Sequence, residues 1–298
     1  MKAFFILLHV IQIAYLSSAR PITSDDVIDL THVLDERAIG WPGNKPYILT
    51  EFKGPKTVNG VNLTWVEVGF LSTAEHIGTH MDAPSHFSKG NWKINDIPPE
   101  RLIGPAVKVS IRDQASKDRD YVLSIQDILN WESVNGRIPN KAILFVDSGF
   151  AKFYPDRIKY SGAEQVVDKD LNLILHYPGI SGEAAQFLVD ERDIVGVVMD
   201  TISFDSGQNS KLFPAHHVLL GAKIWGVENC ADMEKMPATG TIATVYPTKK
   251  RGSGSATRIL VMKTDISISG SFKMFASTTF TVTALSVVLA IIEYSRLI

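Results

Sequence analysis

Short runs of apolar residues, rich in valine and isoleucine and bordered by Gly, Asp or Pro, recur along the chain from residue 107 onward. Continuous apolar runs of this length are typical of strands that are buried on both faces. They predict strands at Val107–Ile111, Ala142–Val146, Ile194–Met199, Ile242–Tyr246 and Ile259–Met262. The Gly- and Ser-rich segment Pro247–Thr257, between the last two runs, is expected to be a flexible loop.

Two segments place their apolar residues at helical spacing instead. In Ser124–Trp131 the apolar residues share one face, and Ser124 with Asp127 forms a capping pair at its start. Ser181 similarly precedes the amphipathic segment Gly182–Glu191. The mixture of strands and helices indicates an α/β or α+β fold with a largely β centre.

Both ends of the chain have the pattern of targeting signals. Residues 1–19 combine Lys2, an apolar stretch and a small-residue ending, which favours a secretory signal peptide over a buried first helix. Residues 272–298 form a hydrophobic tail preceded by small residues, as in the signal for a GPI-type lipid anchor. A single membrane span and a buried terminal helix are the alternatives for this tail. With a lipid anchor or a membrane span, the body of the protein is secreted or faces the outside of the cell.

Residues 20–271 remain as one predicted domain, because no Pro/Ser linker, charge block or repeat divides them. The formal charge of the 298-residue chain is −2, so it lacks the excess of Lys and Arg that binds nucleic-acid phosphates. The single cysteine, Cys230, cannot close an intramolecular disulfide and is expected to be a small buried hydrophobe. Asn62 begins an Asn-Leu-Thr sequon, which predicts a glycosylation site in a secreted protein.

The segment His76-Ile-Gly-Thr-His80-Met-Asp82-Ala-Pro-Ser-His86 concentrates three of the eight histidines. His80 and Asp82, two residues apart, can point to the same side of an extended segment, and Gly78 would let the backbone fold so that His76 joins them. Imidazole and carboxylate ligands suit Zn²⁺ or Mn²⁺. We favour a metal site over a polar surface cluster because ligand types and turn-forming residues occur together.

A second polar group lies more than 100 residues further on. It contains His216 and His217, and then Glu228 at the end of an apolar run. A carboxylate at such a position needs a cation or hydrogen-bond donors, so this group could complete the metal site.

The remaining polar residues are expected to have structural roles or to support the metal ligands. His32 and His176 lack a carboxylate or histidine at ligand spacing and are expected to be structural. Asp200, Ser203 and Asp205 are candidates either for supporting the ligands or for capping a turn.

The stretch from His76 to Phe87 resembles the signature His-x-Gly-Thr-His-x-Asp-x-Pro-x-His-Phe of the metal-dependent cyclase-like hydrolases. That family includes bacterial-type kynurenine formamidase and isatin hydrolase. Weaker matches extend over most of the body: Asp29–His32, Trp41–Gly43, Pro178–Ser181, Val197–Ser203, His216, Glu228 and Gly252–Arg258. The resemblance implies a swivelling β/β/α fold with a central β-barrel in a single domain, usually as a dimer or higher oligomer. Two features depart from it: Asn44 where the family often has Asp, and the secretory signal with the hydrophobic tail.

The resemblance also implies roles for individual residues. The implied metal ligands, for one or two Zn²⁺ or Mn²⁺ ions, are His76, His80, Asp82, His216 and Glu228. Asp82 would bridge two ions, His86 would be the acid/base residue, and Trp41 would lie against an aromatic ring of the substrate.

These roles lead to a functional hypothesis, the hydrolysis of a C–N bond in an aryl formamide or a cyclic aromatic amide. The expected partner is therefore a small aromatic amide, with membrane contact only through the tail or its lipid anchor. The alternative is a catalytically silent, surface-anchored metal-binding protein of the same fold. The complete ligand set together with His86 favours the enzyme.

Overall fold

The structure is a computed structural model that describes residues 22–162 and 175–264. The predicted signal peptide, residues 1–19, and the predicted tail, residues 272–298, lie outside the described residues. The chain divides into a unit formed by Val27–Lys263 and a unit formed by the two ends. In the described part of the terminal unit, Ser24–Asp26 form a short 3-10 helix, η1. All elements below belong to the unit Val27–Lys263.

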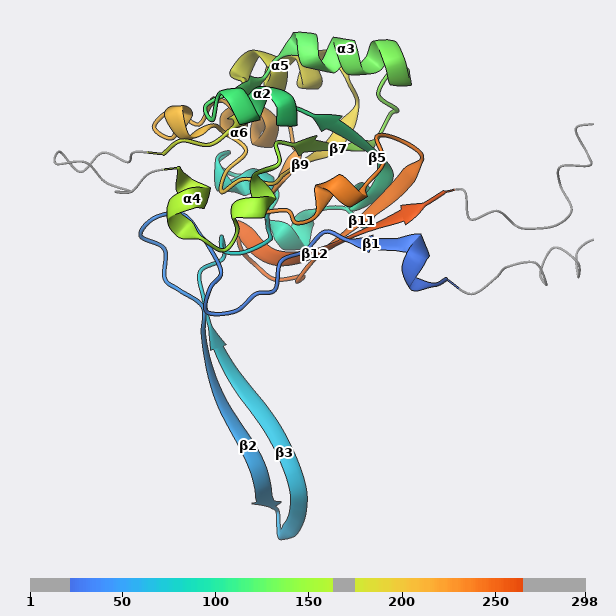
Figure 1. Cartoon of the computed structure of the whole chain (residues 1–298). Coiled ribbons are helices and arrows are strands. Elements are labelled where there is room, and N and C mark those ends of the chain that lie inside the picture. Colours follow the sequence, from blue (N-terminus) through green and yellow to red (C-terminus); the bar gives the residue numbers. More distant parts are fainter. Residues whose placement is uncertain (1–21, 163–174, 265–298) are drawn as a thin grey trace, which may run out of the picture. The chain divides into compact units, whose positions relative to one another are not determined.

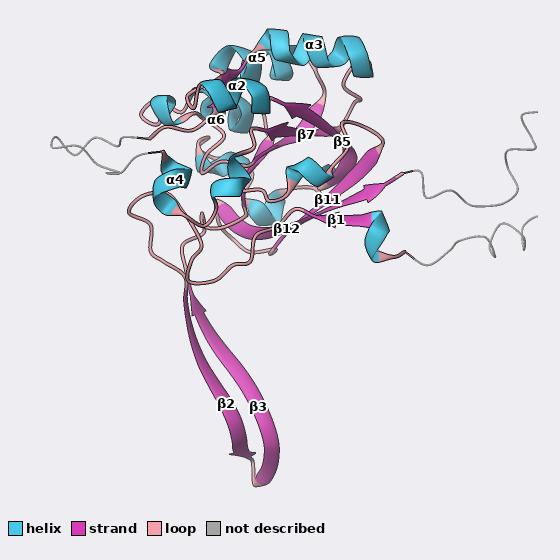
Figure 2. Cartoon of the chain, in the orientation of Figure 1, coloured by secondary structure: helices cyan, strands magenta, loops and turns pink. Residues whose placement is uncertain are grey.

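Among the described residues, seven strands close into a barrel (Figures 1 and 2). In order around the ring they are β12 (Gly254–Lys263), β11 (Thr241–Pro247), β5 (Ile103–Ser110), β7 (Ala142–Asp147), β9 (Ile194–Met199), β10 (Trp225–Glu228) and β4 (His80–Asp82). The short strand β4 pairs with both β10 and β12 and so closes the ring. A further strand, β1 (Val27–Asp29), pairs with the other end of β12. The predicted α/β fold with a central barrel is confirmed.

The parallel strands β5, β7, β9 and β10 form the wall that is buried on both sides. In β7, Ala142, Leu144 and Val146 pack toward the helices, whereas Ile143 and Phe145 pack inside the barrel. Because alternate side chains point to opposite faces, a strand with two buried faces must be apolar throughout. This requirement explains the continuous apolar runs in the sequence.

Helices cover one side of this wall (Figure 1). The covering helices are α3 (Ile125–Asn135), α5 (Gly182–Glu191) and α6 (Pro214–Gly221). Two smaller helices, α2 (Arg112–Lys117) and α4 (Arg157–Ser161), come after β5 and β7 in the sequence. Ser124 and Asp127 form the predicted capping box of α3, and the Ser181 hydroxyl accepts a hydrogen bond from Ala184 N at the start of α5. Both predicted helices are confirmed.

Short elements fill the connections. A two-stranded parallel sheet joins β6 (Val122–Leu123) to β8 (Gly179–Ile180). The remaining 3-10 helices are η2 (Pro84–His86), η3 (Ile94–Asp96), η4 (Pro99–Arg101), η5 (Phe150–Phe153), η6 (Gly207–Asn209) and η7 (Met233–Lys235). Helix η2 begins just after β4 and ends at His86, so it forms the last part of the histidine-rich segment His76–His86.

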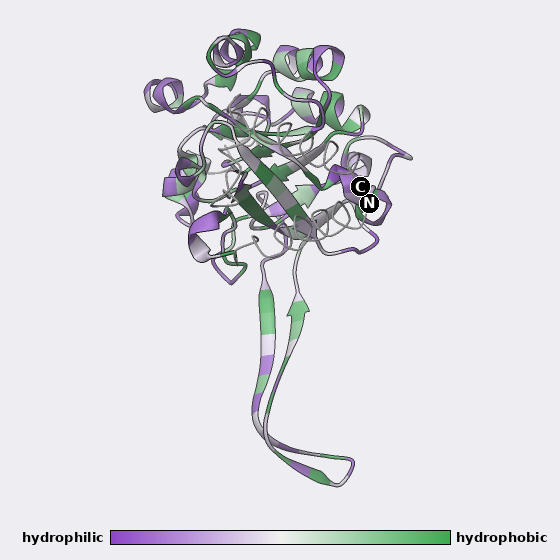
Figure 3. Ribbon diagram, turned by 90° about the vertical axis from the view of Figure 1, so that its right-hand side faces the viewer, coloured by the Kyte–Doolittle hydropathy of each residue, from purple (hydrophilic) through white to green (hydrophobic). Residues whose placement is uncertain are grey.

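A long antiparallel hairpin, β2 (Ile48–Val58) with β3 (Val61–Ser72), was not predicted. Its strands mix apolar and polar residues, with a register shift between Gly54 and Lys56, so they lack the continuous apolar runs of the barrel strands. Figure 3 shows green apolar segments along this ribbon, although most of its side chains are exposed. The hairpin therefore presents apolar surface that residues 22–162 and 175–264 leave exposed.

The five predicted strands are confirmed, with one correction beside them. The segment Pro247–Thr257 is not a loop throughout, because Gly254–Thr257 belong to β12. Gly254 pairs with Asp82 and Ala256 pairs with His80. A Gly/Ser-rich sequence is strand here because β4, an element from a distant part of the chain, provides its pairing partner.

Within residues 22–162 and 175–264, the structure contains no helix with the length and apolarity needed to cross a bilayer.

Close packing at Gly196 in β9 provides a test of the barrel wall. A Cβ atom added at Gly196 would lie 2.4 Å from ring atoms of Trp225, a fully buried side chain whose Nε1 donates to Arg101 O. We expect Gly196→Ala to lower the free energy of unfolding by about 1–3 kcal/mol, the usual cost of overpacking. Denaturant unfolding of the metal-free protein measures this change.

The matched control is Gly221→Ala at the end of α6, where an added Cβ meets no atom within 4 Å. We expect it to be neutral or to stabilise the protein by up to about 1 kcal/mol. Equal unfolding midpoints for the Gly196 variant and the wild-type protein would contradict the packing described here.

Candidate metal centre

Two adjacent strands place the acidic groups of the centre opposite each other. His80 and Asp82 lie on β4, and Glu228 ends the neighbouring strand β10, where it pairs directly with His80. Residues two apart on a strand point to the same face, so all three side chains gather on one side of the sheet. Nε2 of His80 lies 3.3 Å from both Asp82 Oδ1 and Glu228 Oε2.

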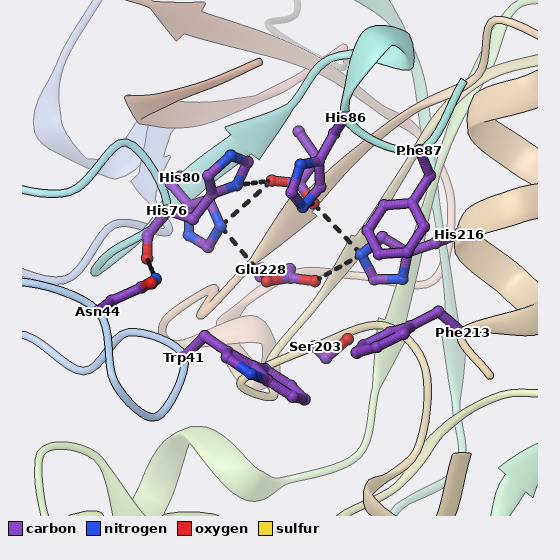
Figure 4. A pocket seen from close by; sticks show the side chains of 11 residues that line it. Trp41, Asn44, His76, His80, His86, Phe87, Ser203, Phe213, His216 and Glu228 are labelled. Atoms are coloured by element: carbon purple, nitrogen blue, oxygen red, sulfur yellow. Dashed lines mark hydrogen bonds and ion pairs between the residues drawn. The ribbon is translucent and has the colours of Figure 1, made fainter. Parts of the chain in front are cut away.

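His76 and His216 approach the same carboxylates from outside these strands (Figure 4). Gly78 has a φ of +60°, and this left-handed residue turns the chain so that Nδ1 of His76 lies 2.6 Å from Asp82 Oδ1. His216 comes from the first turn of α6. Its Nε2 lies 3.3 Å from both Asp82 Oδ2 and Glu228 Oε1.

The spacing of these atoms fits a metal ion. Two ligands of a tetrahedral zinc ion with bonds of about 2.0–2.1 Å are separated by about 3.3 Å. The four nitrogen–oxygen distances that link His80 and His216 to Asp82 and Glu228 are each 3.3 Å. Nε2 of His80 is also buried and has no hydrogen-bond partner. The residues therefore provide a set of donors that can hold a divalent cation.

The other ring nitrogens orient the histidines toward this set. His80 Nδ1 lies 2.9 Å from the carbonyl oxygen of Gly78, and His216 Nδ1 lies 2.7 Å from Asp205 Oδ2. Both partners are acceptors, so each Nδ1 carries a proton, and each Nε2 is the nitrogen that faces the centre and could bind a metal. Asp205 also accepts hydrogen bonds from the backbone nitrogens of Ala215 and His216. It thus both supports a ligand and caps α6, the two roles considered for it.

The electrostatics of the centre demand positive charge. Asp82 and Glu228 are both buried, at 1% and 6% exposure. Burial by itself raises the pKa of Asp82, but the charge of His76 and the hydrogen bonds of the histidines hold it well below its usual value. Burial lowers the pKa of His80, yet the adjacent carboxylates of Asp82 and Glu228 outweigh it and raise this pKa to about 10. Without a metal, protons on the histidines balance the two carboxylates, and a divalent cation would take their place.

His86 differs from the other histidines of the centre. It ends η2, its ring stacks on that of His76 with centroids 4.0 Å apart, and its Nε2 lies 3.8 Å from Asp82 Oδ2. Its side chain is 30% exposed. Burial is the main cause that lowers its pKa to about 4. His86 is therefore a neutral imidazole at the edge of the centre, able to accept a proton.

A pocket of about 220 Å³ opens above these residues (Figure 4). Trp41, Phe87 and Phe213 give it aromatic walls, with the Phe213 ring centroid 5.3 Å from that of Trp41 and 5.1 Å from that of Phe87. Asn44 also lines the pocket, and its Nδ2 donates to the carbonyl oxygen of His76. No role was predicted for Phe213, although its position three residues before the predicted ligand His216 was a usable signal.

The remaining polar candidates separate into different environments. Ser203 lines the pocket, whereas Asp200 accepts backbone hydrogen bonds from Ser148 and Phe150 after β7. His32 stacks on Tyr154 with centroids 3.8 Å apart, and burial lowers its pKa to about 4. His176 has a carboxylate partner that its sequence neighbours did not reveal, since its Nδ1 lies 2.8 Å from Asp120 Oδ2.

Cys230 is fully buried, and burial raises the pKa of its thiol. The expected small buried hydrophobe is confirmed.

The chain is similar to several characterised hydrolases. Isatin hydrolase of Roseibium aggregatum is 29% identical over 208 residues, which cover 66% of this chain and 73% of that protein. Kynurenine formamidase of Bacillus cytotoxicus is 32% identical over 138 residues, which cover 46% of this chain and 59% of that protein.

Solved structures of isatin hydrolases are also similar to this chain. Isatin hydrolase A from Labrenzia aggregata, bound to benzyl benzoate, has a TM-score of 0.70 at 30% identity and covers 87% of this chain and 99% of that chain. An isatin hydrolase bound to the product analogue thioisatinate has a TM-score of 0.68 at 26% identity and covers 79% and 91%. A family model described as "Putative cyclase" matches residues 28–206, more than half of the chain. The protein therefore belongs to this cyclase family, and its named relatives are hydrolases.

Proposed function

We propose that the protein is a metal-dependent hydrolase that cleaves the C–N bond of an aryl formamide or a cyclic aromatic amide. The convergence of the ligand set with the neutral ring of His86, on the floor of an aromatic-walled pocket, carries this proposal. The names of the relatives agree with it, because isatin is a cyclic aromatic amide and N-formylkynurenine is an aryl formamide.

The proposed cofactor is one or two Zn²⁺ or Mn²⁺ ions. Each carboxylate directs its two oxygens at different histidines: Oδ1 of Asp82 and Oε2 of Glu228 lie near His80, while Oδ2 and Oε1 lie near His216. His76, His80 and Asp82 would hold an ion on one side, and the oxygens that face His216 would hold a second ion if two are bound. Imidazole and carboxylate ligands suit both metals, so the donor set alone does not choose between them.

A metal held by these ligands would supply Lewis-acid chemistry, which polarises a carbonyl group and lowers the pKa of water toward about 7. His86 takes a proton from the attacking water as its oxygen adds to the carbonyl carbon. His86 then donates that proton to the amide nitrogen as the C–N bond breaks, which yields a carboxylic acid and an amine. An aniline-like nitrogen leaves more easily than an alkyl amine, which favours aromatic substrates.

Side chains at the pocket walls position the substrate for this step. The rings of Trp41, Phe87 and Phe213 offer stacking and edge contacts to a flat aromatic group. Such contacts hold the carbonyl carbon near the centre and exclude water from the ring. The catalytically silent alternative has less support, since every ligand type and the proton acceptor are present together.

Replacement of His86 tests the catalytic role directly. We expect His86→Ala to lower kcat for N-formylkynurenine or isatin by about 10²- to 10⁴-fold, the usual contribution of a general base. Its metal content should stay at the wild-type value, because the ligands themselves are intact. His176→Gln, a substitution outside the pocket lining, is the matched control and should retain full activity.

The same assay tests the need for metal. A chelator should abolish turnover by the wild-type protein, and Zn²⁺ or Mn²⁺ should restore it. Wild-type protein that binds metal but hydrolyses neither compound would refute the proposed substrate class.

We also propose that the protein forms a homodimer or higher oligomer through the hairpin β2–β3. One face of the hairpin carries Phe52, Val68 and Phe70, exposed at 44%, 41% and 75%. On the other face, Lys53 makes ion pairs with Glu51 and Glu67, and Leu71 is an exposed apolar side chain beside them. An isolated two-stranded ribbon is marginally stable in water, so this apolar face calls for a covering surface.

The size of the hairpin fits a second copy of the chain as that surface. A strand of 11 residues is about 37 Å long, so one face of the two-stranded ribbon offers on the order of 370 Å². In a twofold dimer each subunit buries its own hairpin face against the partner. It also buries an equal area beneath the partner's hairpin, so the buried surface is about 740 Å² per subunit. Stable interfaces bury about 800 Å² per partner.

The oligomer is tested at Phe70, the most exposed apolar side chain of the hairpin. We expect wild-type protein to have at least twice the mass of one chain by light scattering, and Phe70→Glu to shift it to the monomer. Glu67→Gln, on the charged face, should leave the mass unchanged. A monomeric wild-type protein would refute this interface.

We further propose that the chain enters the secretory pathway and carries a glycan on Asn62. The support is the signal-like pattern of residues 1–19 and the position of Asn62, which is exposed near the hairpin turn. After expression of the full chain in eukaryotic cells, peptide N-glycosidase should lower its apparent mass. Asn62→Gln should abolish that shift, and a wild-type chain that the glycosidase leaves unchanged would contradict the proposal.

A further inference from the structure

The Gly/Ser-rich segment before and at the start of β12 is fastened to Glu75, the residue before the first proposed metal ligand. Glu75 Oε2 accepts hydrogen bonds from the backbone nitrogens of Ser253 and Gly254, at 3.0 and 3.2 Å, and from the Ser253 hydroxyl at 3.2 Å. Its other oxygen, Oε1, pairs with Lys250 Nζ. One carboxylate thus organises this whole turn of the chain.

The Ser253 hydroxyl also reaches the metal-ligand motif, because its Oγ lies 3.1 Å from Nε2 of His76. A hydroxyl has a single hydrogen to donate, and an ionised carboxylate can only accept. The hydroxyl therefore donates to Glu75 and accepts the Nε2 proton of His76. This arrangement leaves Nδ1 of His76, which faces Asp82, as the nitrogen available to a metal.

The glycines around Ser253 show how closely this turn lies against its partners. A Cβ atom added at Gly254 would lie 2.5–2.8 Å from ring atoms of His76, and one added at Gly252 would lie 2.1 Å from Glu75 Oε1. The backbone is fixed from the other side as well, since Ala83 N donates to Ser253 O and Ile94 N donates to Gly252 O. Larger residues at the two glycine positions would displace the serine from His76.

We propose that Glu75 and Ser253 are positioning residues, which hold His76 with its proton on Nε2 and so direct its Nδ1 to the metal. The inference rests on the proposed metal centre and extends it to a carboxylate–hydroxyl–imidazole chain. This chain supports His76 in the way that Asp205 supports His216 by direct contact. Partners of this kind orient a ligand and raise its basicity, so their loss weakens metal binding.

The contribution of Glu75 is orientation more than charge. Its side chain is 38% exposed and that of Lys250 is 36% exposed, and ion pairs at such exposure contribute little to stability. The hydrogen bonds to Ser253 and Gly254, by contrast, have a fixed direction. We therefore expect substitution to affect the metal centre more than the fold.

The test is the affinity for Co²⁺, followed by its visible absorption in the absence of any substrate. We expect Ser253→Ala and Glu75→Gln each to weaken Co²⁺ binding by about 10- to 100-fold, as for other partners of metal ligands. The double variant should lose little more than either single variant, because both residues act through one chain of contacts. Ser253→Thr, which keeps the hydroxyl, should restore most of the affinity.

Matched variants separate positioning from general damage. Ser255→Ala lies two residues further on, and the Ser255 hydroxyl contacts only backbone carbonyls of Thr248 and Ala256, so its Co²⁺ affinity should stay within about twofold of wild type. Asp205→Asn should weaken binding to a similar degree through His216. The metal-free thermal midpoints of the Ser253 and Glu75 variants should match that of the wild-type protein.

The outcomes distinguish this inference from the proposed function. Wild-type affinity in both Ser253→Ala and Glu75→Gln would overturn the positioning role even if the enzyme is active. Weakened Co²⁺ binding in a protein that hydrolyses no aromatic amide would support the positioning role and refute only the substrate class. A wild-type protein that binds no Co²⁺, Zn²⁺ or Mn²⁺ would overturn both.

Discussion

The candidate centre depends on one constraint, the burial of Asp82 and Glu228 side by side on adjacent strands. Each buried charge costs several kcal/mol of solvation, and two like charges at close range also repel each other. Only positive charge held between them makes the arrangement stable. His80 and His216 leave their Nε2 atoms at ligand separations from its oxygens, and His76 lies at hydrogen-bond distance from Asp82. The fold thereby builds a site whose electrostatics require a cation, whether protons or a metal.

The closure of the barrel brings the parts of this site together. The three residues of β4 pair with β10 on one side and with β12 on the other. The ligand motif therefore lies between Glu228 and the turn that carries Ser253, although these segments are far apart in the sequence. A short strand with two partners is rigid, so His80 and Asp82 are held on elements with little freedom to move. Such rigidity suits a centre whose donors must keep their separations within a few tenths of an ångström.

One difference from the family pattern lies at the mouth of the pocket. Asn44 stands where the family often has Asp, and its amide donates a hydrogen bond to the carbonyl oxygen of His76. An ionised Asp at this position could not donate that hydrogen bond. The amide of Asn44 therefore connects the loop that carries Trp41 to the ligand motif in a way that Asp could not. The change lies beside the proposed substrate site and leaves the metal ligands untouched.

The sequence determined the elements whose signals are local. Continuous apolar runs specify strands buried on both faces, serine caps mark the starts of α3 and α5, and Gly78 supplies the left-handed turn within the histidine motif. The ligand types are also local information, because imidazole and carboxylate groups in a shaped segment favour a metal.

Tertiary structure decided what depends on contact between distant segments. Gly254–Thr257 form a strand only because β4 lies beside them. The hairpin β2–β3 contains no continuous apolar run from which its strands could be predicted. The support of His76 by Glu75 and Ser253 needs a hydroxyl 177 residues away to reach one ring nitrogen. Such hydrogen bonds depend on the distance and orientation of the two groups in three dimensions. The spacing of the residues along the chain therefore does not predict them.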